Sequence, residues 1–290
     1  MRINLKFTKL FMFLISVLSF NIYAQNNDAK SLPSTGQDSK DSVQKNDISV
    51  SPKIEAKKED QNVISLNVKS LDNAWENRES KEVQEIILKF LQSEPTVPEN
   101  FDIAWRVARL VYFSGNFGIG EGLSNDDHVK IFLYGYKAAE IAKKLEPTKA
   151  EGYYWYAVNI GSYGLAKGVL SALNNASLGR DALLEVVKID PSYHWGGAYR
   201  VLGRYYQEVP RIISFGDKKK AKEYFEKAIE VAPNYIVNTM YLGVLVEDVG
   251  EKTDALKLFR DAEKMPDLDG KNEVIRYKRE LAEDIKKVQD

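Results

Sequence analysis

Residues 221–233 read AKEYFEKAIEVAP, and residues 255–266 read ALKLFRDAEKMP. The two stretches carry Ala, Phe and Ala at matching positions 34 residues apart, and each ends on a proline. Spacings of three and four place these residues on one face of a helix, and the proline marks where that helix stops. A fixed period of this length indicates repeated helical units that bury their apolar faces against one another.

The segments before these two stretches supply a second helix for each unit. Residues 199–206 read YRVLGRYY and residues 242–246 read LGVLV, both with a Leu-Gly pair whose glycine lets another helix come close. Taken together, the two halves resemble the tetratricopeptide repeat. Weaker copies end at Pro147 and Pro191, and a partial first unit ends at Pro95.

The sequence therefore predicts an all-α, tetratricopeptide-like solenoid of helical hairpins over residues 70–290. Most intervals between the terminal prolines exceed the repeat period, so we expect elaborated inter-helix loops at 116–127, 164–177 and 209–217. Residues 272–289 are apolar on one face and charged elsewhere, which is typical of a capping helix at the end of an array. The expected helices cover 81–92, 101–114, 129–145, 150–163, 178–189, 197–207, 218–231, 237–249, 253–264 and 272–289.

Residues 1–24 are expected to be a secretory signal peptide. Arg2, Lys6 and Lys9 precede an apolar run that ends in a small residue. The run is shorter than the roughly 20 residues that span a bilayer, which favours a cleaved signal over a membrane anchor. Residues 25–69 are rich in Ser, Asn, Asp, Gln and Lys and contain no aromatic residue, so we expect a disordered polar linker.

Composition excludes several classes of function. The 290 residues include no cysteine and two histidines, which argues against a disulfide scaffold, a thiol nucleophile and a cysteine-based metal site. The 41 basic residues balance 42 acidic ones, so nucleic-acid binding has no support. His194 and the run Asp126-Asp127-His128 are interpreted as structural. We expect a protein that is not an enzyme and has no cofactor or metal.

In arrays of this kind the first helix of each hairpin lines a concave groove. With Gly203 as the small residue of its helix, helical periodicity points Arg200 and Arg204 into that groove. Arginine suits a carboxylate because its planar guanidinium donates two parallel hydrogen bonds. The alternative is that these arginines pair with nearby Glu and Asp residues. The candidate ligand- or partner-binding residues are Trp105, Arg109, Tyr112, Tyr154, Trp155, Val158, Arg200, Arg204 and Met240.

Four stretches within residues 70–265 point to a narrower family: YYWYAVNIG at 153–161, GLAKG at 164–168, DPSYHWGGA at 190–198 and LGRYY at 202–206. They resemble the T-component family of TRAP transporters, the tripartite ATP-independent periplasmic carriers. The resemblance implies a periplasmic protein that forms homo-oligomers and partners a periplasmic solute-binding protein. It also implies a small carboxylate-bearing or hydrophobic ligand. The chain departs from lipid-anchored members in having no cysteine.

Two non-enzymatic functions follow from these patterns. The leading interpretation is a periplasmic component of solute uptake, with a compact pocket near Tyr154, Arg200 and Arg204. The alternative is an envelope protein–protein interaction scaffold that grips peptide segments in a long open groove.

Overall fold

The computed structural model describes residues 66–93, 95–97, 99–118, 123–266, 268 and 271–289. The expected signal peptide and the expected linker up to residue 65 lie outside the described residues. Within the described residues, no helix combines the length and the apolar character that crossing a bilayer requires. The helices are α2 (Val68–Glu76), α3 (Lys81–Gln92), α4 (Phe101–Phe113), α5 (Asn125–Leu145), α6 (Ala150–Lys167), α7 (Val169–Ile189), α8 (Tyr193–Glu208), α9 (Lys218–Val231), α10 (Ile236–Asp248), α11 (Lys252–Glu263) and α12 (Lys271–Gln289), with a π-helical turn, η1 (Ser114–Gly118).

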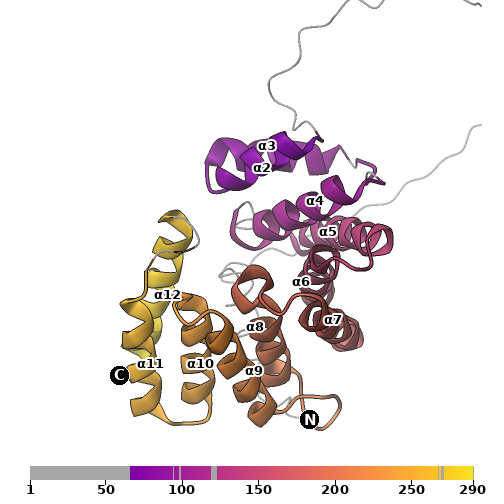
Figure 1. Cartoon of the computed structure of the whole chain (residues 1–290). Coiled ribbons are helices and arrows are strands. Elements are labelled where there is room, and N and C mark those ends of the chain that lie inside the picture. Colours follow the sequence, from indigo (N-terminus) through magenta and orange to yellow (C-terminus); the bar gives the residue numbers. More distant parts are fainter. Residues whose placement is uncertain are drawn as a thin grey trace, which may run out of the picture.

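Four helical hairpins stack side by side to form the body of the molecule (Figure 1). They pair α4 with α5, α6 with α7, α8 with α9, and α10 with α11. Helices α2 and α3 precede the first hairpin, and α12 packs against α11 and α10 at the other end. The described residues contain helices and turns but no strand, so the predicted all-α hairpin solenoid is confirmed.

The last two hairpins are each held together by a phenylalanine ring packed on a glycine of the opposite helix. A Cβ added to Gly203 would lie 2.6 Å from the ring of Phe225, so a larger residue fits only if the ring moves. Gly243 stands in the same relation to Phe259, at 2.5 Å. Both rings are fully buried. The sequence period is thus also a period of side-chain packing.

The loop predicted at residues 164–177 is wrong. Helix α6 runs to Lys167 and α7 begins at Val169, with Gly168 as the link at a φ of 110°. Glycine adopts this left-handed backbone without a steric penalty. Farther along α7, Ala172, Leu173 and Ala176 line the interior at helical spacing, so burial of this face favours a helix over a loop.

The other element boundaries differ less from expectation. Helix α2 begins at Val68, inside the predicted linker, and the Asn67 side chain caps it by accepting a hydrogen bond from the Ser70 amide at 2.9 Å. Part of the loop expected at 116–127 belongs to η1 and α5. The loop expected at 209–217 does connect α8 and α9.

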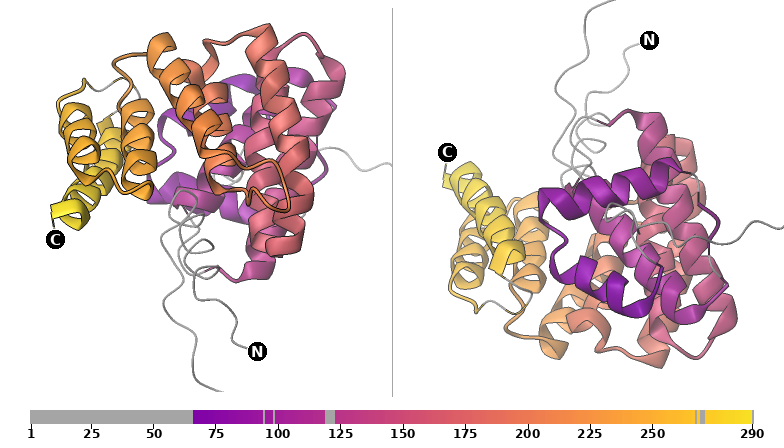
Figure 2. Two further views of the ribbon diagram at one scale, coloured as in Figure 1. Left: turned by 90° about the horizontal axis from the view of Figure 1, so that it is seen from below. Right: turned by 90° about the horizontal axis from the view of Figure 1, so that it is seen from above.

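The array curves so strongly that α12 returns beside the first helices (Figure 2). The Arg276 guanidinium of α12 lies 4.0 Å from the ring centroid of Phe117 in η1. Farther along α12, Lys287 forms an ion pair with Glu247 of α10 at 2.7 Å. The capping helix therefore also closes one side of the concave face.

We expect Phe259→Ala to lower the free energy of unfolding by about 3–5 kcal/mol, because it empties a fully buried ring position against Gly243. Urea denaturation followed by circular dichroism measures the change. The matched control is Lys257→Ala on the exposed face of the same helix, which should shift stability by no more than about 0.5 kcal/mol. Equal stabilities for the two variants would contradict the packing assignment.

Candidate functional site

A central cavity of about 240 Å³ lies on the concave side of the array. Helices from both ends of the chain contribute to it, because α2 and η1 border it on one side and α12 on the other. Its lining is mostly apolar and aromatic, with several arginines. The wall includes Trp75, Arg78, Tyr112, Phe117, Tyr154, Trp155, Val158, Val169, Ala172, Leu173, Ala176, His194, Arg200, Arg204, Glu208, Pro210, Ile213, Val237, Tyr241, Arg276 and Tyr277.

Aromatic rings in mutual edge contact build much of the wall. Trp155 is central: its ring centroid lies 6.2 Å from that of Trp75, 6.0 Å from Tyr112 and 5.0 Å from Tyr154. The Trp155 indole nitrogen also donates a hydrogen bond to the hydroxyl of Tyr193 at 2.9 Å. This packing fixes the rings and gives the cavity a rigid apolar surface.

Among the residues that the structure describes, four arginines and one acidic residue, Glu208, line the cavity. Arg200 is held from several directions: it donates to Asn238 Oδ1 at 2.9 Å and to the Trp195 carbonyl at 3.3 Å, and contacts His194 Nδ1 at 3.2 Å. These neutral partners satisfy its hydrogen bonds without cancelling its charge. The guanidinium of Arg200 therefore keeps a full positive charge in a buried setting.

Arg204 and Glu208 form a buried ion pair one helical turn apart. Their atoms Nη2 and Oε1 are 2.8 Å apart, and Arg204 also donates to Gln207 Oε1 at 2.9 Å. Burial raises the pKa of Glu208, while the charge of Arg204 opposes that rise. Removing either partner would leave a buried charge uncompensated.

A left-handed backbone turn positions His194 and Arg200 at the start of α8. His194, Trp195 and Gly196 have φ values of 53°, 54° and 71° in succession. Two non-glycine residues in this region store strain, which the surroundings must offset. Asn238 donates to the Trp195 carbonyl at 3.2 Å, and the Trp195 ring stacks on Tyr235 at 4.9 Å.

The His194 ring is buried between Tyr154 and Arg200. It stacks on Tyr154 with centroids 5.1 Å apart and rings 20° from parallel. Burial, together with the nearby charge of Arg200, lowers the pKa of His194 to about 3. The imidazole is thus neutral at physiological pH and accepts a hydrogen bond from Arg200.

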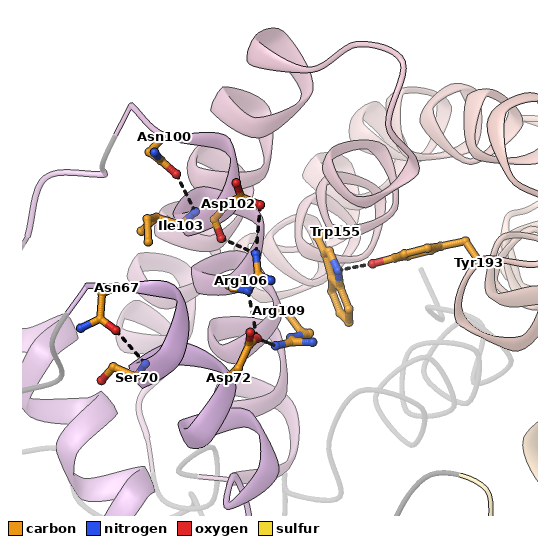
Figure 3. A network of polar contacts seen from close by, with 10 residues as sticks. All are labelled: Asn67, Ser70, Asp72, Asn100, Asp102, Ile103, Arg106, Arg109, Trp155 and Tyr193. Atoms are coloured by element: carbon orange, nitrogen blue, oxygen red, sulfur yellow. Dashed lines mark hydrogen bonds and ion pairs between the residues drawn. The ribbon is translucent and has the colours of Figure 1, made fainter.

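Helix α2 is fixed over one end of the cavity by a shared carboxylate (Figure 3). Asp72 accepts from Arg106 Nε and from Arg109 Nη2, both at 2.9 Å, and both arginines belong to α4. The same helix carries Trp75 into the lining, and Arg78 follows it just beyond the helix end. The Asp72 contacts therefore set the position of one cavity wall.

Six of the nine candidate binding residues lie in the cavity wall: Tyr112, Tyr154, Trp155, Val158, Arg200 and Arg204. Trp105 and Arg109 lie outside the lining. The Arg109 guanidinium lies 4.8 Å from the Trp105 ring centroid and forms an ion pair with Asp72. Met240 is buried in the core instead. On α10 the residues that line the cavity are Val237 and Tyr241. The prediction of Met240 was therefore one residue away from Tyr241.

Sequence reasoning missed the parts of the wall that come from the two ends of the chain. Trp75, Arg78 and Phe117 precede the clear repeats, and Arg276 belongs to a helix interpreted only as a cap. Phe117 sits in a π-helical turn inside a glycine-rich segment, and such turns are frequent at functional sites. A large aromatic residue among glycines is the signal that could have drawn attention to it.

The stacked hairpins and the central cavity define a tetratricopeptide-like helical scaffold. The crystal structure of a thermophilic TPR protein from Thermus thermophilus has the same fold, with a TM-score of 0.54 over 75% of this chain and 96% of its own. The two sequences are 12% identical, so the likeness concerns the fold alone.

The model of the family Regulator of microtubule dynamics protein 1-3 matches residues 67–215, and the chain belongs to this family. Regulator of microtubule dynamics protein 1 of Bos taurus is 25% identical over 188 residues, which are 59% of this chain and 56% of the relative. The Mus musculus protein of the same name is 21% identical over 188 residues, 59% of this chain and 58% of its own. The chain thus matches somewhat more than half the length of these relatives.

The family match corrects the assignment to the TRAP T-component family, which is wrong. Stretches 153–161 and 190–198, on which that resemblance rested, both lie inside the matched region. They build helix contacts and cavity wall, features that do not identify a transporter component. The predicted solute-binding protein partner falls with it, as do the transport role and the homo-oligomer and ligand class that the resemblance implied. The periplasmic location is corrected too, because the matched relatives are mammalian and mammalian cells have no periplasm.

We expect the stability of the wild-type protein to fall with acidification more steeply than that of His194→Asn. The folded pKa lies below the ordinary value near 6.5, so the unfolded chain takes up a proton that the folded chain does not. This contribution is complete above about pH 6.5 and is lost as the pH falls toward 3, at about 1 kcal/mol per pH unit between about pH 6 and pH 4. Asparagine tolerates the left-handed backbone and does not titrate.

Urea unfolding at a series of pH values gives the two slopes. If His194→Asn keeps the wild-type slope, the buried neutral state of His194 is refuted.

Proposed function

We propose that this chain is a non-enzymatic protein-interaction scaffold that holds a short acidic segment of a partner protein in its central cavity. The observation that carries the proposal is a cluster of guanidinium groups in an aromatic-walled cavity. Among the described residues, four guanidinium groups line it together with the carboxylate of Glu208. Arg204 pairs with Glu208 and Arg276 with Glu280, while the buried Arg200 donates to Asn238 and to the Trp195 carbonyl, which are neutral.

Electrostatics supports an acidic occupant. A charge inside a cavity that excludes water interacts more strongly than one in solvent, so a buried guanidinium group with neutral partners, such as that of Arg200, favours a carboxylate. Arginine also binds a carboxylate through two parallel hydrogen bonds, which gives direction as well as attraction. The rings of Tyr112, Trp155 and Tyr241 offer apolar surface for a neighbouring side chain of the same segment.

The shape of the cavity supports a short segment. An open groove would accept a long extended peptide, but contact between Arg276 and Phe117 closes one side of the concave face. A few residues, with an acidic group among the arginines and an apolar side chain against the rings, match this bounded space. The family name, Regulator of microtubule dynamics protein 1-3, is consistent with a protein-binding module.

The proposal is tested with fluorescent hexapeptides that combine several glutamates with one phenylalanine or leucine. We expect the acidic pool to bind and a pool with lysine in place of glutamate not to bind, as measured by fluorescence anisotropy. Quenching of tryptophan emission gives a second readout, since Trp75 and Trp155 line the cavity.

The double variant Arg78→Gln, Arg276→Gln should raise the Kd of the acidic peptides about tenfold or more, because each hydrogen bond between charged groups contributes about 1.5–3 kcal/mol. The matched control is Arg260→Gln, Arg279→Gln, which removes the same charge from exposed positions on α11 and α12. Binding that does not distinguish acidic from basic peptides, or that both double variants weaken equally, would refute the proposal.

A further inference from the structure

Two turns, one between α6 and α7 and one between α8 and α9, carry aliphatic side chains that are exposed to solvent. Leu170, at the start of α7, is 80% exposed, and Ile212, in the loop between α8 and α9, is 97% exposed. Val169 and Ile213 beside them are also exposed. Clustered aliphatic exposure of this kind marks a surface that contacts something other than water.

Both turns border the central cavity. Val169 and Ile213 line it, one from each turn. The loop between α8 and α9 also packs on α7, where the Arg180 guanidinium lies 4.6 Å from the ring centroid of Phe215. Leu170 and Ile212 are thus exposed beside residues that line one cavity, and we refer to this surface as the rim.

The charges around this rim are basic. Residues 152–180 contain no Asp or Glu, and Lys167 lies three residues before Leu170. Residues 209–216 also contain no acid, and Arg211 stands exposed next to Ile212. Four acids border these stretches. Asp181 pairs with Arg180, Glu208 pairs with Arg204, and Asp217 caps α9 through the Lys219 and Lys220 amides. Glu151 lies in the first turn of α6, at the other end of that helix from Lys167.

We propose that this rim, defined by Lys167, Val169, Leu170, Arg211, Ile212 and Ile213, docks on an anionic membrane surface. Aliphatic side chains enter the boundary between headgroups and acyl chains, while neighbouring basic residues attract anionic lipids. A second copy of the chain is a poorer occupant, because symmetric pairing through this rim would bring Lys167 and Arg211 against basic residues of the same rim. The docking surface goes beyond the cavity function and does not depend on it.

Vesicle sedimentation with the full chain tests the proposal. We expect binding to vesicles of phosphatidylcholine containing about one third phosphatidylserine, and weaker binding to phosphatidylcholine alone. Leu170→Ser, Ile212→Ser should reduce binding to the anionic vesicles about tenfold or more, because two buried aliphatic side chains are lost. Lys167→Gln, Arg211→Gln should reduce binding to the anionic vesicles and remove most of its dependence on salt.

The matched control is Leu145→Ser, Val249→Ser, which shortens two other exposed aliphatic side chains away from the rim. It should bind vesicles like the wild type. Thermal unfolding should show that all variants keep the wild-type midpoint, as expected for exposed positions. The proposal is overturned if the wild type does not sediment with anionic vesicles or if the rim variant binds as well as the control. It is equally overturned if the rim substitutions change only self-association.

Acidic-peptide binding separates this result from the cavity proposal. The rim variant should bind the acidic hexapeptides with the wild-type Kd, because neither Leu170 nor Ile212 is part of the cavity lining. A rim variant that no longer binds anionic vesicles but still binds the acidic peptides supports the two functions independently.

Discussion

The fit of a phenylalanine ring against a glycine in the opposite helix sets how closely the two helices of a hairpin approach. At Gly203 and Gly243 an added Cβ would meet the ring at 2.6 Å and 2.5 Å, so the helix separation allows nothing larger without rearrangement. Because successive units pack on one another, the separation within one hairpin influences the placement of the next. The array as a whole curves, and these close contacts fix the helix separation within its last two hairpins (Figure 2).

That curvature explains why one cavity gathers residues from both ends of the chain. Helix α2 and the turn η1 come from the start of the described chain, and α12 comes from its end. The array bends until Arg276 reaches Phe117, which encloses a space lined by the first helices of the hairpins. An arginine in such a space is expensive to desolvate, and here neutral acceptors and aromatic faces take much of the role that carboxylates usually fill. Arg200 illustrates this, with Asn238, the Trp195 carbonyl and the ring of Tyr235 around it.

Much of this architecture was accessible from the sequence because it is periodic. The Ala-Phe-Ala spacing predicted the hairpins, and the expected helix at 81–92 has the bounds of α3. Helical spacing and the position of Gly203 also predicted that Arg200, Arg204 and Tyr154 face the same space, and all three line the cavity.

The wrong predictions fall where periodicity gives no guidance. Helix α10 is buried on nearly all sides. Its hydrophobic pattern therefore does not distinguish Met240 from Tyr241 as the residue that faces the cavity. The closure of the array by α12 depends on summed curvature, which no local segment encodes. The family assignment failed for a related reason, since the aromatic and glycine-rich stretches on which it rested build helix contacts and cavity wall.

The left-handed turn at His194 and Trp195 connects backbone strain to the electrostatics of the cavity. Strain at two non-glycine residues persists only where surrounding contacts outweigh it, and Asn238 and Tyr235 supply such contacts from the next hairpin. The turn lays the His194 ring on Tyr154 and directs its Nδ1 toward Arg200. A solvent-exposed histidine in this place would add a positive charge as the pH fell, and the cavity charge would vary with pH. Buried as it is, with a pKa near 3, His194 stays neutral and acts as an acceptor for the arginine. The positive character of the cavity therefore rests on arginines, whose charge does not change over the physiological pH range.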